Sequence, residues 1–208
     1  TSFVGVAIDC SEPQFETQDL ITPSSLLHTA NLDTLDHIQD GALIEMWSIT
    51  DKVWEPKTSI QIKKQSFGTN PFQRQRDVIE SLEIIDQNLQ TVCLNHQGGS
   101  QGTQIYLPLC YRIKAVLKYG TSFDSYSVII VSDFLENSQL ANFYHLEETD
   151  IPKEITRFQE YEPLGNLSDW HFTLVPIQNP HYSEESRIAL RFFQKLLEEA
   201  GAIVSIGL

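Results

Sequence analysis

Positive charge is scarce in this chain. Of its 208 residues, 14 are Lys or Arg and 28 are Asp or Glu, so the formal net charge is −14 with His neutral. Such a chain should repel phosphate backbones and anionic lipids, and the best local basic cluster is only Lys63-Lys64. We therefore expect no nucleic-acid partner, and instead a cation or a partner with a basic surface.

Long apolar runs and cysteines are also few. No apolar run approaches the roughly 20 residues that span a bilayer, so we expect no integral membrane segment. The three cysteines, Cys10, Cys93 and Cys110, are too few and odd in number for a disulfide framework. Two alternatives stay open, a Cys93–Cys110 pair or three reduced thiols. The chain begins at Thr1 rather than Met, and we favour a bacterial periplasmic or secreted protein with a removed leader, leaving a cytoplasmic location open.

The remaining composition is that of an ordinary globular protein. Hydrophobic residues make up 41% of the chain and charged residues 20%. We expect one domain over residues 1–208, large enough to bury a hydrophobic core without stabilising disulfides or metal ions. The segment 147–169 has the least regular pattern and is predicted to be a surface excursion or a loop that contacts a partner.

Apolar runs and helical stripes alternate along the chain. Strands are predicted at residues 2–8, 43–49, 59–62, 127–131, 171–175 and 203–206. Helices are predicted at residues 24–38, 73–89, 105–118 and 184–200, with a shorter one near 137–145. This alternation predicts an α/β fold with a doubly wound, mostly parallel sheet of about six strands, a three-layer Rossmann-like arrangement.

Such sheets carry their sites outside the carboxyl ends of the strands. Asp9 and Ser11 follow the first strand, Ser132 and Asp133 follow the strongest strand, and Gly102-Thr103 precedes the third helix. Carboxylates and hydroxyls form an all-oxygen site, which suits Mg²⁺, Mn²⁺ or Ca²⁺ rather than Zn²⁺. The alternative is structural, because Asp, Ser and Thr at these places are also good helix caps.

In this order, these segments resemble a von Willebrand factor A domain. That family has Asp-x-Ser-x-Ser after one strand, a later Gly-Thr, and Ser-Asp-Gly after a central strand, which together form a metal-ion-dependent adhesion site. The resemblance implies metal ligation by Asp9, Ser11, Thr103 and Asp133. Two positions depart from the pattern: Pro13 replaces the second Ser, and Phe134 replaces the Gly.

The resemblance implies a non-enzymatic interaction module that binds a partner carboxylate through a divalent cation. The ion would be Mg²⁺, with Mn²⁺ or Ca²⁺ as alternatives, or absent because Pro13 removes a hydroxyl. Glu12, Phe134 and Gly102 are the predicted partner-binding residues around it. Two alternatives remain: a metal-free scaffold that uses Phe134, segment 147–169 and Trp54, or a metal-dependent hydrolase.

Other chemistries find less support in the sequence. The glycines at 98–102 lack the Lys of a phosphate-binding loop. Cys10 stands at a strand end, but no His or Arg is placed to serve it as a nucleophile. The six His show no paired spacing suited to zinc. Trp54 is the tryptophan that we expect to be exposed.

Overall fold

A computed structural model describes residues 1–10, 22, 41–50, 54, 56–66, 68, 70–91, 93, 102–118 and 123–207. The predicted helix at 24–38 and the site residues Ser11, Glu12 and Pro13 lie outside these described residues. Within the described part of the chain, no helix is both long and apolar enough to cross a membrane.

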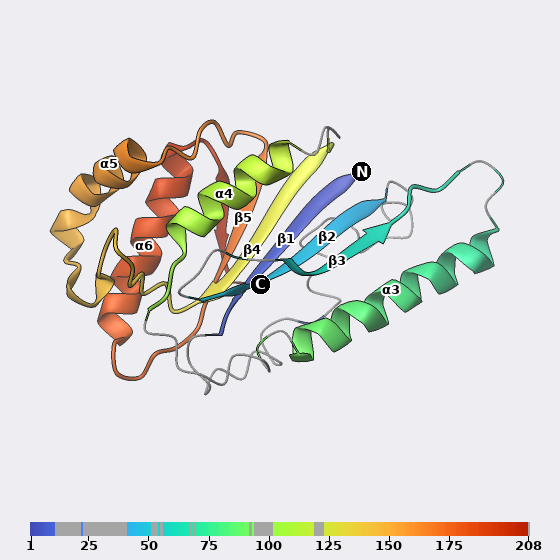
Figure 1. The fold of residues 1–208 in the computed structure, drawn as a ribbon, viewed down its shortest axis with the longest axis horizontal. Helices are drawn as coiled ribbons and strands as arrows, with labels where there is room; N and C mark the ends of the chain where they lie inside the picture. The colour runs from blue at the N-terminus through green and yellow to red at the C-terminus, as the bar shows by residue number, and fades with distance from the viewer. Residues whose placement is uncertain are drawn as a thin grey trace.

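The structure is built on one six-stranded sheet (Figure 1). The strands are β1 (Ser2–Asp9), β2 (Ala42–Ile49), β3 (Pro56–Ile62), β4 (Ser125–Ser132), β5 (Trp170–Pro176) and β6 (Ile203–Ile206). Their order is β3-β2-β1-β4-β5-β6, and all neighbours are parallel except the β2–β3 pair. The prediction of a mostly parallel α/β sheet of about six strands is confirmed. The order reverses direction between β1 and β4, so the topological switch point lies there.

The helices agree with the sequence pattern in three places and differ in two. They are α3 (Pro71–Thr91), α4 (Tyr106–Leu117), α5 (Ile151–Tyr161) and α6 (Ser183–Glu199), with 3₁₀ turns η2 (Phe143–His145) and η3 (Glu148–Asp150). The short helix predicted near 137–145 is only the turn η2. The predicted irregular excursion at 147–169 was wrong, because η3 and α5 occupy most of it and α5 buries Ile151, Ile155 and Phe158.

The two faces of the sheet carry separate apolar cores, and alternate residues of β1 supply both. Phe3 and Ala7 join the larger core, which also holds the buried faces of α4, α5 and α6. The second core contains Val4, Val6 and Ile8 of β1. It also takes Val78, Ile85 and Leu89 from α3, which lies along β3 and apart from the other helices (Figure 1). A strand that is buried on both faces has a continuous apolar sequence, and for this reason β1 could be predicted from the sequence.

Trp54 is buried rather than exposed, which corrects the expectation from sequence. Its ring stacks on Trp47 with centroids 6.1 Å apart, and its indole Nε1 donates a hydrogen bond to the Gln104 carbonyl at 2.9 Å. Trp54 thus belongs to the larger core although it lies outside the strands and helices.

The cysteines pair in a way that the sequence did not indicate. Cys10 and Cys93 form a disulfide with their Cα atoms 5.2 Å apart and 83 positions apart in the chain. Cys110 is a free, buried thiol. Both alternatives drawn from the sequence are therefore wrong, because the end of β1 and the segment after α3 meet only in the tertiary structure.

We predict that replacing both Cys10 and Cys93 with Ser will lower the free energy of unfolding by about 4 kcal/mol, because the cross-link restricts a long loop of the unfolded chain. The melting temperature should fall by about 10 °C, measured by circular dichroism. Wild-type protein treated with dithiothreitol should melt like the double variant. An unchanged melting temperature would contradict the assigned contribution of the disulfide.

Candidate functional site

The carboxyl ends of β1 and β4 meet at the switch point and bring polar side chains together. Asp9 ends β1 and Ser132 ends β4, each one position beyond the last pair that these two strands form with each other, Ile8 with Val131. The Ser132 hydroxyl donates a hydrogen bond to Asp9 Oδ2 at 2.6 Å, and its oxygen accepts one from the Phe134 backbone N–H at 2.9 Å. Asp9 and Ser132 are both buried. The sequence expectation that these strand ends converge is therefore met for Asp9 and Ser132.

Asp133 is buried beside this pair and is held by two hydrogen bonds. Its Oδ1 accepts from the Leu135 N–H at 3.0 Å, and its Oδ2 accepts from Asn179 Nδ2 at 2.8 Å. Asn179 is itself buried and follows the end of β5 by three residues. Sequence reasoning missed Asn179, although the rule that sites follow strand ends applies to β5 as well.

Gly102 and Thr103 pack against the same loop from the other side. The Asn137 N–H donates to the Thr103 carbonyl at 2.8 Å, and Thr103 is buried. A Cβ atom on Gly102 would lie 2.4 Å from the Asn137 carbonyl oxygen. Glycine is therefore required here by a close approach of two backbones.

Phe134 is not exposed at the rim of the site, as its predicted partner-binding role would require. Its side chain is fully buried, and its ring lies 5.8 Å from that of Phe193 in α6, measured between centroids. Its backbone has φ = 63°, in the left-handed region that bulky residues rarely adopt and glycine adopts freely. Burial of the ring offsets the conformational cost of this backbone.

Glu136 is a further polar residue that the sequence analysis did not identify. Its carboxylate is fully buried, and Oε2 accepts hydrogen bonds from the backbone N–H groups of Ile105 at 2.7 Å and Tyr106 at 3.1 Å. It thus caps the first turn of α4 from a distant loop, where Ile105 offers no side-chain cap. Burial raises the pKa of Glu136 above its ordinary value, and the hydrogen bonds from Ser138, Ile105 and Tyr106 only partly oppose this.

The raised pKa of Glu136 predicts a pH-dependent stability. The folded protein binds this proton more tightly than the unfolded chain, so the stabilisation is complete below the unfolded pKa of about 4.3 and is lost as pH rises through the folded pKa. Glu136→Gln keeps an acceptor for both N–H groups and removes the titration. Relative to wild type, this variant should gain stability as pH rises from about 4 to about 7, measured by urea unfolding.

Glu160→Gln is the matched control for that experiment, since Glu160 is exposed on α5. Its stability relative to wild type should stay level over the same pH range. A Glu136→Gln profile that is equally level would show that this carboxyl group titrates no differently in the folded and unfolded chain.

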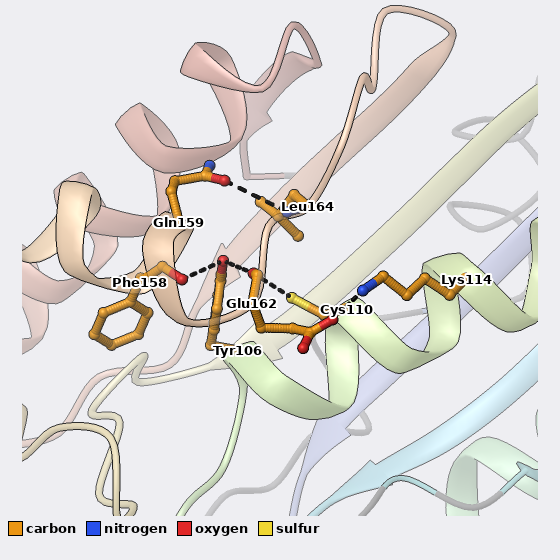
Figure 2. Close-up of polar contacts among 7 residues, drawn as sticks. All are labelled: Tyr106, Cys110, Lys114, Phe158, Gln159, Glu162 and Leu164. Atoms are coloured by element: carbon orange, nitrogen blue, oxygen red, sulfur yellow. Dashed lines mark hydrogen bonds and ion pairs between the residues drawn. The ribbon is translucent and has the colours of Figure 1, made fainter.

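A second polar cluster joins α4 to the end of α5 (Figure 2). The Tyr106 hydroxyl lies 3.1 Å from the Phe158 carbonyl and 2.5 Å from that of Glu162, and Lys114 pairs with the Glu162 carboxylate. The Cys110 thiol donates to the Glu162 carbonyl at 3.7 Å, and burial is the main cause that raises the pKa of Cys110 to about 12. A thiol with that pKa is not a nucleophile at neutral pH, so this cluster is structural.

A cavity of about 550 Å³ opens beside Asn179, between the end of β5 and the start of α6. Its lining mixes apolar residues, among them Pro176, Ile177 and Leu190, with polar ones, among them Ser183 and Arg187. The Arg187 guanidinium is already paired with Glu184 at 2.7 Å, so it is not an uncompensated charge in this cavity.

The metal-ligand set predicted from sequence is described only in part. The structure places Asp9 and Asp133 at the same sheet edge, with Thr103 in the loop that packs against 133–137. Ser11 and the partner-binding candidate Glu12 lie outside the described residues. Among the described residues, no three His, Cys, Asp or Glu side chains gather as a metal cluster.

Comparison with known proteins identifies no family for this chain. No family model matches the chain, and no curated protein matches it. Among solved structures, the chain is similar to the human COPII-coat protein Sec24c, with 9% sequence identity and a TM-score of 0.42. The match covers 100% of this chain and 29% of that one, so the chain spans less than a third of that protein's length.

Proposed function

We propose that this chain is a von Willebrand factor A-like interaction module with a three-layer α/β architecture. It binds a partner protein through a divalent cation at the carboxyl edge of the sheet. The observation that carries the proposal is the contact between Ser132 and Asp9, with Oγ and Oδ2 2.6 Å apart at the switch point. It supports the idea that the aspartate after β1 and the Ser-Asp pair after β4 work as one group.

The backbone of Phe134 adds independent support to the resemblance. The family pattern has Gly after the Ser-Asp pair, and Phe134 holds the left-handed conformation, φ = 63°, that a glycine takes without cost. Its backbone conformation therefore fits that pattern even though the side chain does not.

The donor atoms present suit a hard cation. Asp9, Thr103 and Asp133 offer oxygens, and Ser11 would complete the set that the resemblance implies. Hydrogen bonds from Ser132, Leu135 and Asn179 orient the carboxylates of Asp9 and Asp133. When bound, the ion would supply an electrophilic position for a carboxylate of the partner.

The chain's own residues account for the rest of the proposed mechanism. Asp9 and Asp133 place two carboxyl groups in a buried setting at the carboxyl edge of the sheet. Ser132 and Asn179 fix the two carboxylates, and Gly102 lets the Thr103 loop approach closely. The net charge of −14 favours cation capture, and compensation by the cation would allow an acidic protein to bind an acidic side chain.

One observation favours a metal-free scaffold as the second candidate. Both oxygens of Asp133 already accept hydrogen bonds, from Leu135 and Asn179, as a purely structural aspartate would. The contact surface of such a scaffold would exclude Phe134 and Trp54, which are buried. In either case, the Cys10–Cys93 disulfide favours an oxidising compartment such as the periplasm or the cell exterior.

We predict that Mn²⁺ and Mg²⁺ titrated into EDTA-stripped protein will bind saturably with 1:1 stoichiometry, measured by calorimetry. Asp133→Ala should weaken this binding at least about tenfold by removing one carboxylate from the site. It should also cost about 1–3 kcal/mol of stability, because the Leu135 N–H and Asn179 lose their acceptor.

Asp169→Ala is the matched control, since Asp169 is exposed at the opposite end of the sheet, just before β5. This variant should bind metal like wild type. Absence of binding heat in the wild-type protein, together with no thermal stabilisation by metal, would refute the cation site and leave the metal-free scaffold.

A further inference from the structure

We propose that the Cys10–Cys93 disulfide is a reversible redox switch that docks the end of α3 against the site-bearing end of β1. The proposal concerns a pair of cysteines that the fold, rather than the sequence, brings together. It extends the proposed function in that Asp9 precedes Cys10, but its main test does not depend on metal binding.

The disulfide is placed where the secondary structure ends. β1 makes its last pairings at Asp9, opposite Ile49, and at Ile8, opposite Val131. Just past Asp9, the Cys10 N–H donates to the Ile49 carbonyl over a long 3.3 Å, and the Cys10 side chain bonds to Cys93. The cross-link therefore fixes the backbone immediately after the candidate ligand Asp9.

Among the described side chains, fewer apolar ones of α3 than of α6 are buried in a core. Among its described side chains, α3 sends Val78, Ile85 and Leu89 into the second core, while Phe72 and Ile79 stay exposed. By contrast, α6 buries six apolar residues, which are Ile188, Ala189, Phe192, Phe193, Leu196 and Leu197. Since Cys93 follows α3 by two residues, the disulfide secures the end of this helix to the end of β1.

Both redox states find partners in this geometry. Cys10 Sγ lies 3.5 Å from the Ile8 carbonyl oxygen, and Cys93 Sγ lies 4.0 Å from that of Asp9. Each sulfur therefore has a backbone carbonyl oxygen nearby that could accept a hydrogen bond from the thiol formed by reduction. Cys93 is partly exposed whereas Cys10 is buried, which makes Cys93 the sulfur that a reductant reaches.

The chemical step needs a dithiol reductant. One of its thiolates attacks Cys93 Sγ, the S–S bond breaks, and Cys10 leaves as a thiolate that takes up a proton. The second thiol of the reductant then displaces Cys93 and closes its own disulfide. Two electrons and two protons have passed to the chain, and the reductant is oxidised by the same two electrons.

Hydrogen exchange on the intact chain tests the proposal, with dithiothreitol as the reductant. Reduction under native conditions should speed amide exchange at least about tenfold in the last turns of α3 and at Cys10, while exchange in α6 stays unchanged. Reoxidation should restore the slow rates, and the double variant of Cys10→Ser with Cys93→Ser should exchange like the reduced protein. Cys110→Ala, which keeps the disulfide, should respond to dithiothreitol as wild type does.

Three results would overturn the switch. These are a disulfide that is reduced only when the whole protein unfolds, exchange that accelerates equally in α3 and α6, or exchange that does not change at all. Calorimetry with Mn²⁺ on the oxidised and reduced forms separates this from the proposed function. If Mn²⁺ binds equally to the oxidised and reduced forms, the effect of the switch is limited to α3. If Mn²⁺ binds to neither form, the cation site is refuted, and the exchange data still decide whether the switch exists.

Discussion

The rest of the structure depends on burial of the two central strands on both faces. β1 and β4 lie between two cores, so their side chains from Phe3 to Ile8 and from Val128 to Val131 are apolar or small. A polar group within either strand would have to be desolvated without a partner. Polar chemistry is therefore displaced to the strand ends, and at the switch point the ends of β1 and β4 are neighbours. The Ser132–Asp9 hydrogen bond is the first consequence of that constraint.

The loop from Asp133 to Asn137 connects this edge to the elements around it. Asp133 reaches Asn179 after β5, Glu136 caps α4, and Asn137 holds the Thr103 carbonyl. Phe134 anchors the loop by burying its ring against α6, and accepts an uncommon backbone conformation to do so. One short segment thus contacts the residues after β5 and the helices α4 and α6. A structural change at the candidate site would therefore alter contacts to all three elements.

The two faces of the sheet are secured differently. On the side of α4, α5 and α6, a broad aromatic core and the Tyr106–Glu162 cluster join the helices to one another. On the other side, the described part of α3 relies on a narrow apolar stripe and a covalent link to β1. Packing energy is spread over many contacts, whereas a disulfide is a single bond that a reductant can remove. The disulfide therefore adds one reducible bond between the end of α3 and the site edge to the packing of the second core.

Sequence alone determined the class of fold and the location of the polar edge. Apolar runs such as 127–131 identify doubly buried strands, the stripe through Val78, Ile85 and Leu89 identifies α3, and the parallel alternation places Asp9 and Asp133 after strand ends. These features are periodic or local, so neighbouring residues carry them. The metal set itself stays a prediction, carried by a family resemblance.

Only the tertiary structure decided which distant groups meet. The Cys10–Cys93 pair, the cap that Glu136 supplies to α4, the Asn179–Asp133 bond and the burial of Trp54 and Phe134 all join segments far apart in the chain. A cysteine or an aromatic residue has the same local pattern whether it is buried or exposed, since its environment is set by packing and not by its neighbours in sequence. For that reason, only the tertiary structure shows which cysteines pair and which aromatic side chains are buried.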